Sequence, residues 1–217
     1  MFENIMIPVC PLCNNKKNNL FYQDKNRDYW KCAVCQLLFV PPDQFLSLEE
    51  EKARYDLHRN SPNDPEYRRF LSRLFDPMQQ RVAQGSKGLD FGSGPGPTLS
   101  AMFVEAGYEM KIYDPFYAQN PEVLNEKYDF ITTSEVVEHL HHPGQELTRL
   151  RQMLKPNGYL GIMTKMVPSK EAFGRWYYKN DPTHVCFFSK DTFLWLIDKW
   201  EAKIEFMDND VVLIKMV

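Results

Sequence analysis

Four of the five cysteines in this 217-residue sequence form two C-x2-C pairs. The first pair is Cys10 and Cys13, and the second, eighteen residues further on, is Cys32 and Cys35. Each pair can form a tight turn with both thiolates on one side, and four thiolates are the tetrahedral ligands of a structural Zn2+ site. Two disulfides are disfavoured because the chain shows no export signal, and a redox C-x-x-C would not need a second copy. The spacing therefore predicts structural zinc and leaves Cys186 as a small buried apolar residue.

A second set of residues with chemical meaning lies in GLDFGSGPGPTLSAMF, residues 88–103. Three glycines alternate there, where a strand is expected to pass into a helix: Gly92, Gly94 and Gly96. A phosphate P-loop is excluded because no Gly-Lys-Ser/Thr follows, and the third glycine of a dinucleotide fingerprint would fall at Pro97. Asp90 precedes the glycines, and Asp114 stands at the end of the next expected strand. Carboxylates suit an ammonium and a ribose diol but repel phosphates, so the pattern fits a nucleoside that carries an amino acid and no phosphate.

The elements that must position these residues alternate along the second half of the chain. Strands are expected at 88–92, 110–113, 128–133 and 159–164, with helices at 98–106 and 144–154. This alternation predicts an α/β fold in which helices cover both faces of a mostly parallel, doubly wound sheet. A helix capped by Ser189 is expected at 190–200. The segments 202–207 and 211–216, joined by Asp-Asn-Asp, then predict a C-terminal antiparallel hairpin.

Length and composition allow one full core and a small appendage, because 43% of the residues are hydrophobic and 25% are charged. We expect three parts: a zinc-ribbon-like domain at 1–42, a helical linker and cap at 43–84, and the ligand-binding domain at 85–217. No apolar run is long enough to span a bilayer, so a cytoplasmic protein is expected.

Two helices are expected in the segment 43–84. Ser47 and Glu50 match a capping box for the first helix, and Asp64 with Pro65 matches the start of the second. Four residues between the helices would either roof a substrate pocket or form a solvated linker, and the linker is the favoured interpretation. They are Tyr55, His58, Arg59 and Asn60.

Four motifs resemble those of class I S-adenosylmethionine-dependent methyltransferases and occur in the same order. They are GLDFGSGPG at 88–96, YDP at 113–115, YDFITTSEVVEHL at 128–140 and LKPNGYLGIMT at 154–164. The resemblance covers about residues 85–217 and implies a seven-stranded sheet that ends in an antiparallel hairpin. Only thirteen residues separate Asp114 from Tyr128, so the third strand and its helices are expected to be shortened or missing.

The resemblance also implies roles for matching residues. The glycine loop would approach the methionine portion of S-adenosylmethionine, and Asp90 would help to orient its ammonium. Both ribose hydroxyls would donate to Asp114, and Pro115 or Phe116 would flank the adenine. Two residues at the end of the following strand would line the pocket near the sulfonium: Ser134 and Glu135.

Methyl transfer from a sulfonium requires alignment and exclusion of water, and a base helps when the acceptor carries a proton. The candidate bases are His139, His184 and Glu135. Glu135, Glu138 and His139 have the E-x-x-E-H spacing that would place them on one side of a helical turn. This spacing is similar to that of the ubiquinone-pathway O-methyltransferases, where it is linked to a divalent cation near the acceptor. Bracing of the pocket wall is the favoured interpretation, because hard cations usually want more oxygen ligands.

The segment 165–189 is expected to form a lid and to recognise the acceptor, since loops at strand ends form the ligand pocket in this architecture. It contains six aromatic residues and His184. The alternative is a hydrophobic cluster beneath a long loop. His141 and His142 are expected to be solvated loop residues.

The net charge of −3 argues against a nucleic-acid surface, and residues 1–40 carry five Lys/Arg against three Asp/Glu. The predicted function is transfer of a methyl group from S-adenosylmethionine to an O or N acceptor, with a small molecule favoured as partner. The alternative is a zinc-ribbon nucleic-acid or protein binding module that carries a tethered RNA or protein methyltransferase, or a silent domain.

Overall fold

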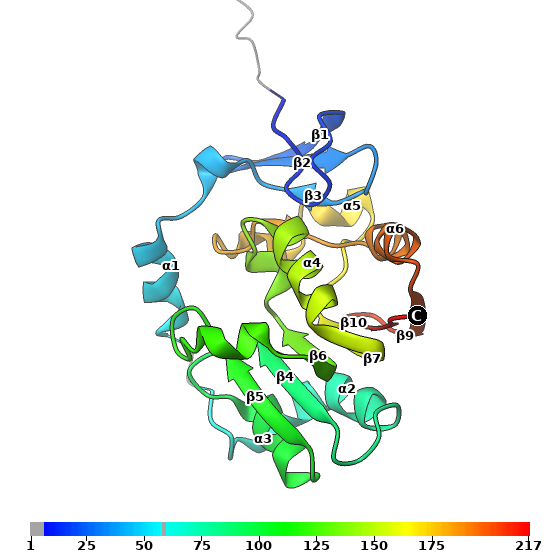
Figure 1. The fold of residues 1–217 in the computed structure, drawn as a ribbon. Helices are drawn as coiled ribbons and strands as arrows, with labels where there is room; N and C mark the ends of the chain where they lie inside the picture. Colours follow the sequence, from blue (N-terminus) through cyan, green and yellow to red (C-terminus); the bar gives the residue numbers. More distant parts are fainter. Residues whose placement is uncertain (1–6, 58–59) are drawn as a thin grey trace, which may run out of the picture.

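A six-stranded sheet forms the centre of the protein (Figure 1). The computed structural model describes residues 7–57 and 60–217. In spatial order, the strands are β5 (Glu109–Tyr113), β4 (Lys87–Phe91), β6 (Tyr128–Ser134), β7 (Leu154–Met163), β10 (Val211–Lys215) and β9 (Lys203–Met207). The first four strands are parallel, and β10 runs antiparallel to both β7 and β9. The mostly parallel α/β sheet and its C-terminal hairpin are therefore confirmed.

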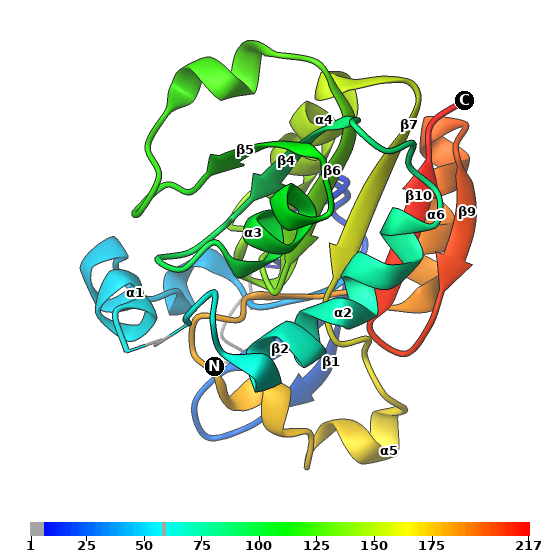
Figure 2. The same cartoon turned by 90° about the horizontal axis from the view of Figure 1, so that it is seen from below.

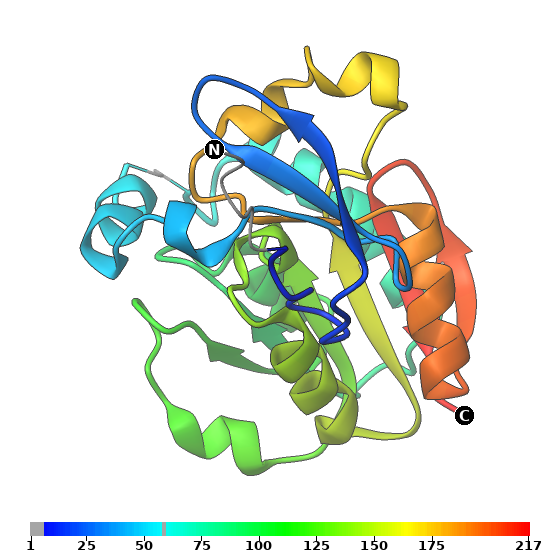
Figure 3. The ribbon, with the colours of Figure 1, turned by 90° about the horizontal axis from the view of Figure 1, so that it is seen from above.

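Helices cover both faces of this sheet. One face carries α2 (Pro65–Gln79) and α3 (Thr98–Glu105), and the other carries α4 (Pro143–Met153) and α6 (Lys190–Trp200) (Figures 2 and 3). Strand β10 shows the alternation that two covered faces require. Its Val212 and Ile214 join one hydrophobic core, while Val211 and Leu213 join the other. The sheet is therefore the middle layer of three.

The described sheet has six strands, so the expectation of seven strands is wrong, while the shortened third-strand region is confirmed. After β5, Asp114 forms an isolated bridge with Ala118, and a short 3-10 helix, η2 (Pro121–Asn125), leads to β6. The Tyr128 hydroxyl donates to the Val123 carbonyl at 2.7 Å and so binds η2 to the first residue of β6. Too few residues remain for a strand with two flanking helices, so β5 is the edge strand.

Most boundaries agree with the sequence prediction because local signals set them. Helix α6 begins after Ser189 and covers the expected residues, and the expected caps at Ser47 and Asp64 are both present. The exception is β7, which begins at Leu154 and not at residue 159. Helix α4 passes directly into this strand, and its C-cap residue Leu154 already has extended dihedral angles.

The N-terminal ribbon, residues 7–42, forms a second small sheet together with the segment 165–189. Its strands are β1 (Asn18–Gln23), β2 (Asp28–Cys32), β3 (Leu38–Phe39) and β8 (Cys186–Phe187), in that spatial order. Leu38 pairs with Phe187, so the fourth strand comes from the other half of the chain. The boundaries at residues 42 and 84 remain predictions.

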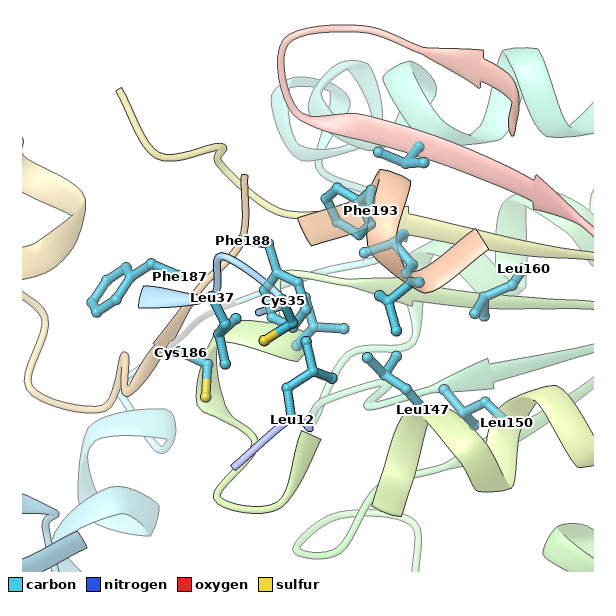
Figure 4. Close-up of a cluster of buried hydrophobic side chains, with 14 of the residues drawn as sticks. Leu12, Cys35, Leu37, Leu147, Leu150, Leu160, Cys186, Phe187, Phe188 and Phe193 are labelled. Atoms are coloured by element: carbon cyan, nitrogen blue, oxygen red, sulfur yellow. The ribbon is translucent and has the colours of Figure 1, made fainter. Parts of the chain in front are cut away.

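The ribbon shares a hydrophobic core with the large domain (Figure 4). Leu12, Cys35 and Leu37 of the ribbon belong to the same buried cluster as Leu147 of α4. Cys186 is fully buried in this cluster, which confirms its expected character. At the start of α4, the Gly144 amide donates to the Pro11 carbonyl, and an added Cβ at Gly144 would lie 2.3 Å from the Leu12 oxygen. The first cysteine turn thus packs closely on α4. Within residues 7–57 and 60–217, no helix is both long and apolar enough to cross a bilayer.

Candidate active site

A cavity of about 740 Å3 opens beyond the carboxyl ends of β4, β5 and β6. Its wall includes Gly94, Asp114 and Glu135 from the strand ends, and His184 from the segment before β8. Its volume is typical of a site for small molecules, and ligands bind at this edge of open parallel sheets. The cavity therefore brings Gly94 and Asp114, which were expected to bind the cofactor, together with the candidate bases Glu135 and His184.

Asp114 is held in place by three backbone amides. Its Oδ1 accepts from the amides of Phe116 at 2.8 Å and Tyr117 at 3.0 Å, and its Oδ2 accepts from the Gly94 amide at 2.9 Å. The side chain is largely buried and still lines the cavity. Asp114 therefore links the glycine loop to the turn after β5. Both lone pairs of Oδ1 accept backbone hydrogen bonds, whereas Oδ2 keeps one lone pair for a ligand donor.

The three glycines of the loop serve different purposes. A Cβ at Gly92 would lie 2.4 Å from Val136 Cγ2, and one at Gly96 would lie 2.1 Å from the Asn60 carbonyl oxygen. Gly94 has φ of +63°, and a Cβ there would meet no heavy atom within 4 Å among the described residues. Gly92 and Gly94 line the cavity, whereas Gly96 packs against the linker and is not part of the wall. Only Gly94 leaves open space for a ligand.

Asp90 lies behind the loop and is not one of the residues of the cavity wall. Its Oδ1 accepts a hydrogen bond from the Thr132 hydroxyl at 2.9 Å. Burial raises the pKa of this carboxyl to about 6. The structure therefore places Asp90 where it supports the strand end, and any effect on an ammonium in the cavity would act across the loop.

Three buried polar atoms of the wall have no hydrogen-bond partner among the described residues. They are the hydroxyls of Ser93 and Ser134 and Oε1 of Glu135. Buried polar groups are nearly always paired, so these atoms mark where a polar ligand would bind. Ser93 was missed in the sequence, and its only signal is its place between two glycines. Pro115 and Phe116 also line the cavity, as expected for residues beside an adenine. The open space at Gly94, the fixed carboxylate of Asp114 and the unpaired serine hydroxyls together fit a nucleoside with an amino acid tail.

A buried acidic network centred on Tyr178 lies behind Glu135, which is the member of the network that lines the cavity. The Tyr178 hydroxyl can donate to Glu138 or, at 3.3 Å, to Glu135. Thr164 donates to the second carboxylate oxygen of Glu138 at 2.9 Å. Burial raises the pKa of Glu135 to about 7, and burial with the neighbouring Glu135 charge raises that of Glu138 to about 8. Since both oxygens of Glu138 accept protein hydrogen bonds, the network supports the bracing interpretation of this residue.

Glu135 has φ of +53°, a left-handed conformation that is costly for a residue with a Cβ. Such strain is typical of functional sites, and here it turns the side chain at the end of β6 towards the cavity. Tyr178 was not recognised in the sequence, where its only signal was the aromatic composition of the segment 165–189. Its partner Thr164 had no signal beyond its place at the end of an expected strand.

His139 and His184 contact each other in the wall of the cavity. The ring of His139 is bonded through Nδ1 to the Thr183 carbonyl at 3.2 Å, and that of His184 to the Tyr178 carbonyl at 2.7 Å. A carbonyl only accepts, so Nδ1 carries the proton in both rings and the lone pair of a neutral ring lies on Nε2. Ligating atoms of Glu138, His139 and His184 lie within 4.8 Å of one another. The E-x-x-E-H motif is thus completed by His184 from a distant segment.

A family model described as a methyltransferase domain matches residues 55–204. The chain belongs to this methyltransferase family. Solved structures share the fold. The 1,6-didemethyltoxoflavin-N1-methyltransferase of Burkholderia thailandensis is similar, with a TM-score of 0.51 at 14% identity over 89% of this chain and 96% of that one. A SAM-dependent methyltransferase of Archaeoglobus fulgidus has a TM-score of 0.50 at 20% identity, over 73% of this chain and 78% of that one. A search of curated proteins found no match.

Helix α1 (Leu48–Tyr55) and Asn60 form part of the wall of the methyltransferase cavity. The ring of Tyr55 lies between Phe116 and His139, with centroid distances of 5.7 and 5.4 Å. Asn60 also lines the cavity, so the solvated-linker interpretation is wrong for Tyr55 and Asn60. His58 and Arg59, named with them, lie outside the described residues.

The two histidines after the motif differ in environment. His141 is half-buried, its Nε2 lies 2.8 Å from Oε1 of Glu51 on α1, and its ring packs on Phe45. The expected solvation is therefore wrong for His141, because α1 folds over the end of the sheet. His142 is exposed, as expected, although it also borders the cavity.

The segment 165–189 of the methyltransferase contributes Asp181 and His184 to the cavity wall. It contains α5 (Lys170–Phe173) and η4 (Tyr177–Asn180), and its Phe173 and Phe187 are buried against ribbon aromatics such as Tyr29. The segment therefore contains both the expected hydrophobic cluster and a part of the cavity wall, while its expected recognition of the acceptor remains a prediction. Its action as a lid remains a prediction.

The four paired cysteines of the methyltransferase converge. The sulfurs of Cys10 and Cys35 lie 3.5 Å apart, and those of Cys13 and Cys32 lie 3.4 Å apart. All four ligand atoms lie within 4.8 Å of one another, and none of these cysteines forms a disulfide. Tetrahedral zinc with bonds of ~2.3 Å holds its sulfurs ~3.8 Å apart, so the geometry fits the metal.

Proposed function

We propose that this methyltransferase binds S-adenosylmethionine at the Asp114 end of its cavity and methylates an O or N atom of a small molecule at the His184 end. The observation that carries the proposal is that one cavity joins these two residues. Asp114 would accept from a ribose hydroxyl at the remaining lone pair of Oδ2. The open space at Gly94 and the unpaired Ser93 and Ser134 hydroxyls would accommodate the rest of the nucleoside and its amino acid tail.

The cofactor would supply an electrophilic methyl group, so the chain's residues mainly have to align the acceptor and exclude water. Tyr55 supports this function because its ring lines the cavity and contacts the rings of both Phe116 and His139. Oε1 of Glu135 has no described partner and would accept a hydrogen bond from the acceptor or the cofactor.

We assign the role of general base to His184. The hydrogen bond from Nδ1 to the Tyr178 carbonyl orients its ring and fixes a proton on Nδ1, so Nε2 is the nitrogen that would take a proton from the acceptor. His139 lies beside it in a similar tautomer, and Glu135 is the alternative base because burial raises the pKa of its carboxyl to about 7. These three residues are the candidates for catalysis.

The charges on the wall favour a neutral or cationic acceptor. Besides Asp114, the charged residues on the described part of the wall are four acids and one base: Glu51, Glu135, Glu146, Asp181 and Arg149. A phosphate-rich acceptor would be repelled here, because nucleic-acid binding depends on Lys and Arg contacts to phosphates. This distribution supports a small-molecule acceptor over RNA. We further propose that the cysteine cluster holds one structural Zn2+.

Transfer of labelled methyl groups tests this function. The protein is incubated with methyl-tritiated S-adenosylmethionine and, separately, with pooled metabolites, tRNA, rRNA or protein extract. We expect label in the low-mass fraction, and its loss with the His184→Gln variant. Label confined to RNA or protein would contradict the proposed acceptor class, and no transfer to any pool would contradict the proposed activity.

A further inference from the structure

Arg27 of the ribbon is bonded to the backbone of the segment that carries His184. Its Nη1 donates to the carbonyls of His184 at 2.9 Å and Pro182 at 3.2 Å. Its Nη2 donates to the carbonyls of Asp181 at 3.0 Å and Lys179. One guanidinium therefore binds four carbonyls of a single turn, and its side chain is only 8% exposed.

Two further ribbon residues hold the same turn. The Tyr29 hydroxyl donates to the Lys179 carbonyl at 3.2 Å, and the Lys179 ammonium donates to Asp24 at 2.7 Å. Both Tyr29 and Lys179 are buried. The turn that carries His184 is thus attached to the ribbon through side chains as well as through the sheet.

Backbone hydrogen bonds continue this connection to the other histidine. The amide of Val40, just after β3, donates to the Val185 carbonyl at 2.9 Å. The Val185 amide in turn donates to the Glu138 carbonyl at 2.8 Å. Residue 185 is therefore joined on one side to the ribbon and on the other to the 3-10 helix η3 (Val137–His139) that presents His139.

We propose that the ribbon is an integral part of the acceptor site and that Arg27 positions the imidazole of His184. The ring bonds to the carbonyl of Tyr178 and packs on the ring of that residue, with centroids 4.1 Å apart. Tyr178 directly precedes the residues whose carbonyls Arg27 binds, so loss of Arg27 would loosen the backbone that holds this side of the ring. The inference rests on the proposed function, in which His184 receives a proton.

The chemistry of the turn requires arginine. Four carbonyls that converge on one buried point need several donors in a planar arrangement, and a guanidinium has five N–H groups in a fixed fork. A lysine at this place has three donors on a single atom and cannot reach four carbonyls in the same geometry. Arg27→Lys should therefore keep the fold and only partly hold the turn.

Nitrogen NMR of the histidine rings tests the inference without a known acceptor. The full-length, zinc-loaded protein is saturated with S-adenosylhomocysteine, and the His184 ring signals are assigned by their loss in His184→Gln. We expect the wild type to show one tautomer, with the proton on Nδ1. Arg27→Gln should show the mixed tautomers of a mobile imidazole, and its Val185 amide should exchange with solvent about tenfold faster.

Lys25→Met is the matched control, since this exposed residue lies in the same ribbon turn and should leave both signals unchanged. Zinc content and affinity for S-adenosylhomocysteine should be the same in all variants that fold. If Arg27→Gln loses zinc, the same two measurements on Arg27→Lys test the inference. We expect its His184 tautomer signals and its Val185 amide exchange to lie between those of the wild type and those of a mobile imidazole. An unchanged His184 tautomer in the folded variant would overturn the inference, whereas absence of methyl transfer in the wild type would overturn only the proposed function.

Discussion

The imidazole rings of His139 and His184 meet edge to face, with their centroids 4.6 Å apart and their planes at 70°. One ring comes from the turn after β6, and the other comes from the turn before β8. The bond from the Val185 amide to the Glu138 carbonyl holds these turns together. The part of the cavity wall that contains His139 and His184 is therefore assembled by tertiary contacts between segments that are distant in the sequence.

Replacing His184 by glutamine should remove the base and keep the volume of the side chain. We expect turnover of the labelled acceptor to fall on the order of a hundredfold, the usual value of base catalysis, with unchanged affinity for S-adenosylhomocysteine. His139→Gln is the comparison variant and should have a smaller effect. A rise in the Michaelis constant alone would show that His184 only binds the acceptor.

A pair of glycine substitutions separates cofactor contact from backbone strain. Gly94 and Gly85 both have positive φ, and an added Cβ at either would meet no described heavy atom within 4 Å. Alanine at either position should therefore cost a similar ~1 kcal/mol of stability. Only Gly94→Ala should also weaken binding of S-adenosylhomocysteine, by about tenfold or more, because only Gly94 lines the cavity. Equal affinities in calorimetry would contradict this placement of the cofactor.

The raised pKa of Glu138 should appear in the stability of the protein without cofactor. The folded protein keeps this proton up to about pH 8, whereas an unfolded glutamic acid loses it near pH ~4.3. The stabilising contribution is therefore full below pH ~4.3 and is lost as the pH rises through the folded pKa. The free energy of unfolding should fall on the order of 2 kcal/mol between pH 6 and 8.

Urea denaturation at several pH values, with zinc present, measures this effect. In Glu138→Gln the side chain is neutral at every pH, so the decline should be much shallower than in the wild type. Glu109→Gln removes an exposed carboxyl and serves as control, with the wild-type slope expected. A decline of the same size in Glu138→Gln would show that the proton is bound elsewhere.

The cysteine cluster should bind one zinc ion per chain. Cys13→Ser removes one of four ligands and should lose most of the metal in elemental analysis, and the ribbon should unfold first. Cys186→Ser is the matched control, because Cys186 is buried in the same core but lies outside the cluster. Wild-type protein prepared without chelators and found free of zinc would contradict the assignment.

Local signals predicted the parts of this fold that depend on short segments. The cap at Ser189 and the apolar spacing after it define α6, and the acid at Asp114 follows its strand as expected. The motif order then indicated the sheet and the strand-end residues Gly94 and Asp114, which line the cavity. These features could be predicted because each is determined by residues within about one turn or one strand.

The part of the cavity wall around His139 and His184 could not be predicted in the same way. Nothing local to Leu38 indicates that it pairs with Phe187, and nothing in Arg27 indicates four carbonyl partners far along the chain. Tyr55 was placed in a solvated linker because the folding of α1 over the sheet end is a tertiary event. Long-range pairing leaves no periodic pattern in either segment, so it became visible only in the structure.

Calorimetric titration with S-adenosylhomocysteine tests the central claim most directly, because it requires no acceptor. We expect one site per chain in the wild type. In Asp114→Ala the binding should be weaker by ~1.5 to 3 kcal/mol, the usual cost of lost hydrogen bonds to a charged group. Asp208→Ala, which removes an exposed carboxylate in the hairpin turn, should bind like the wild type. Absence of binding in the wild type, or unchanged affinity in Asp114→Ala, would contradict a cofactor site in this cavity.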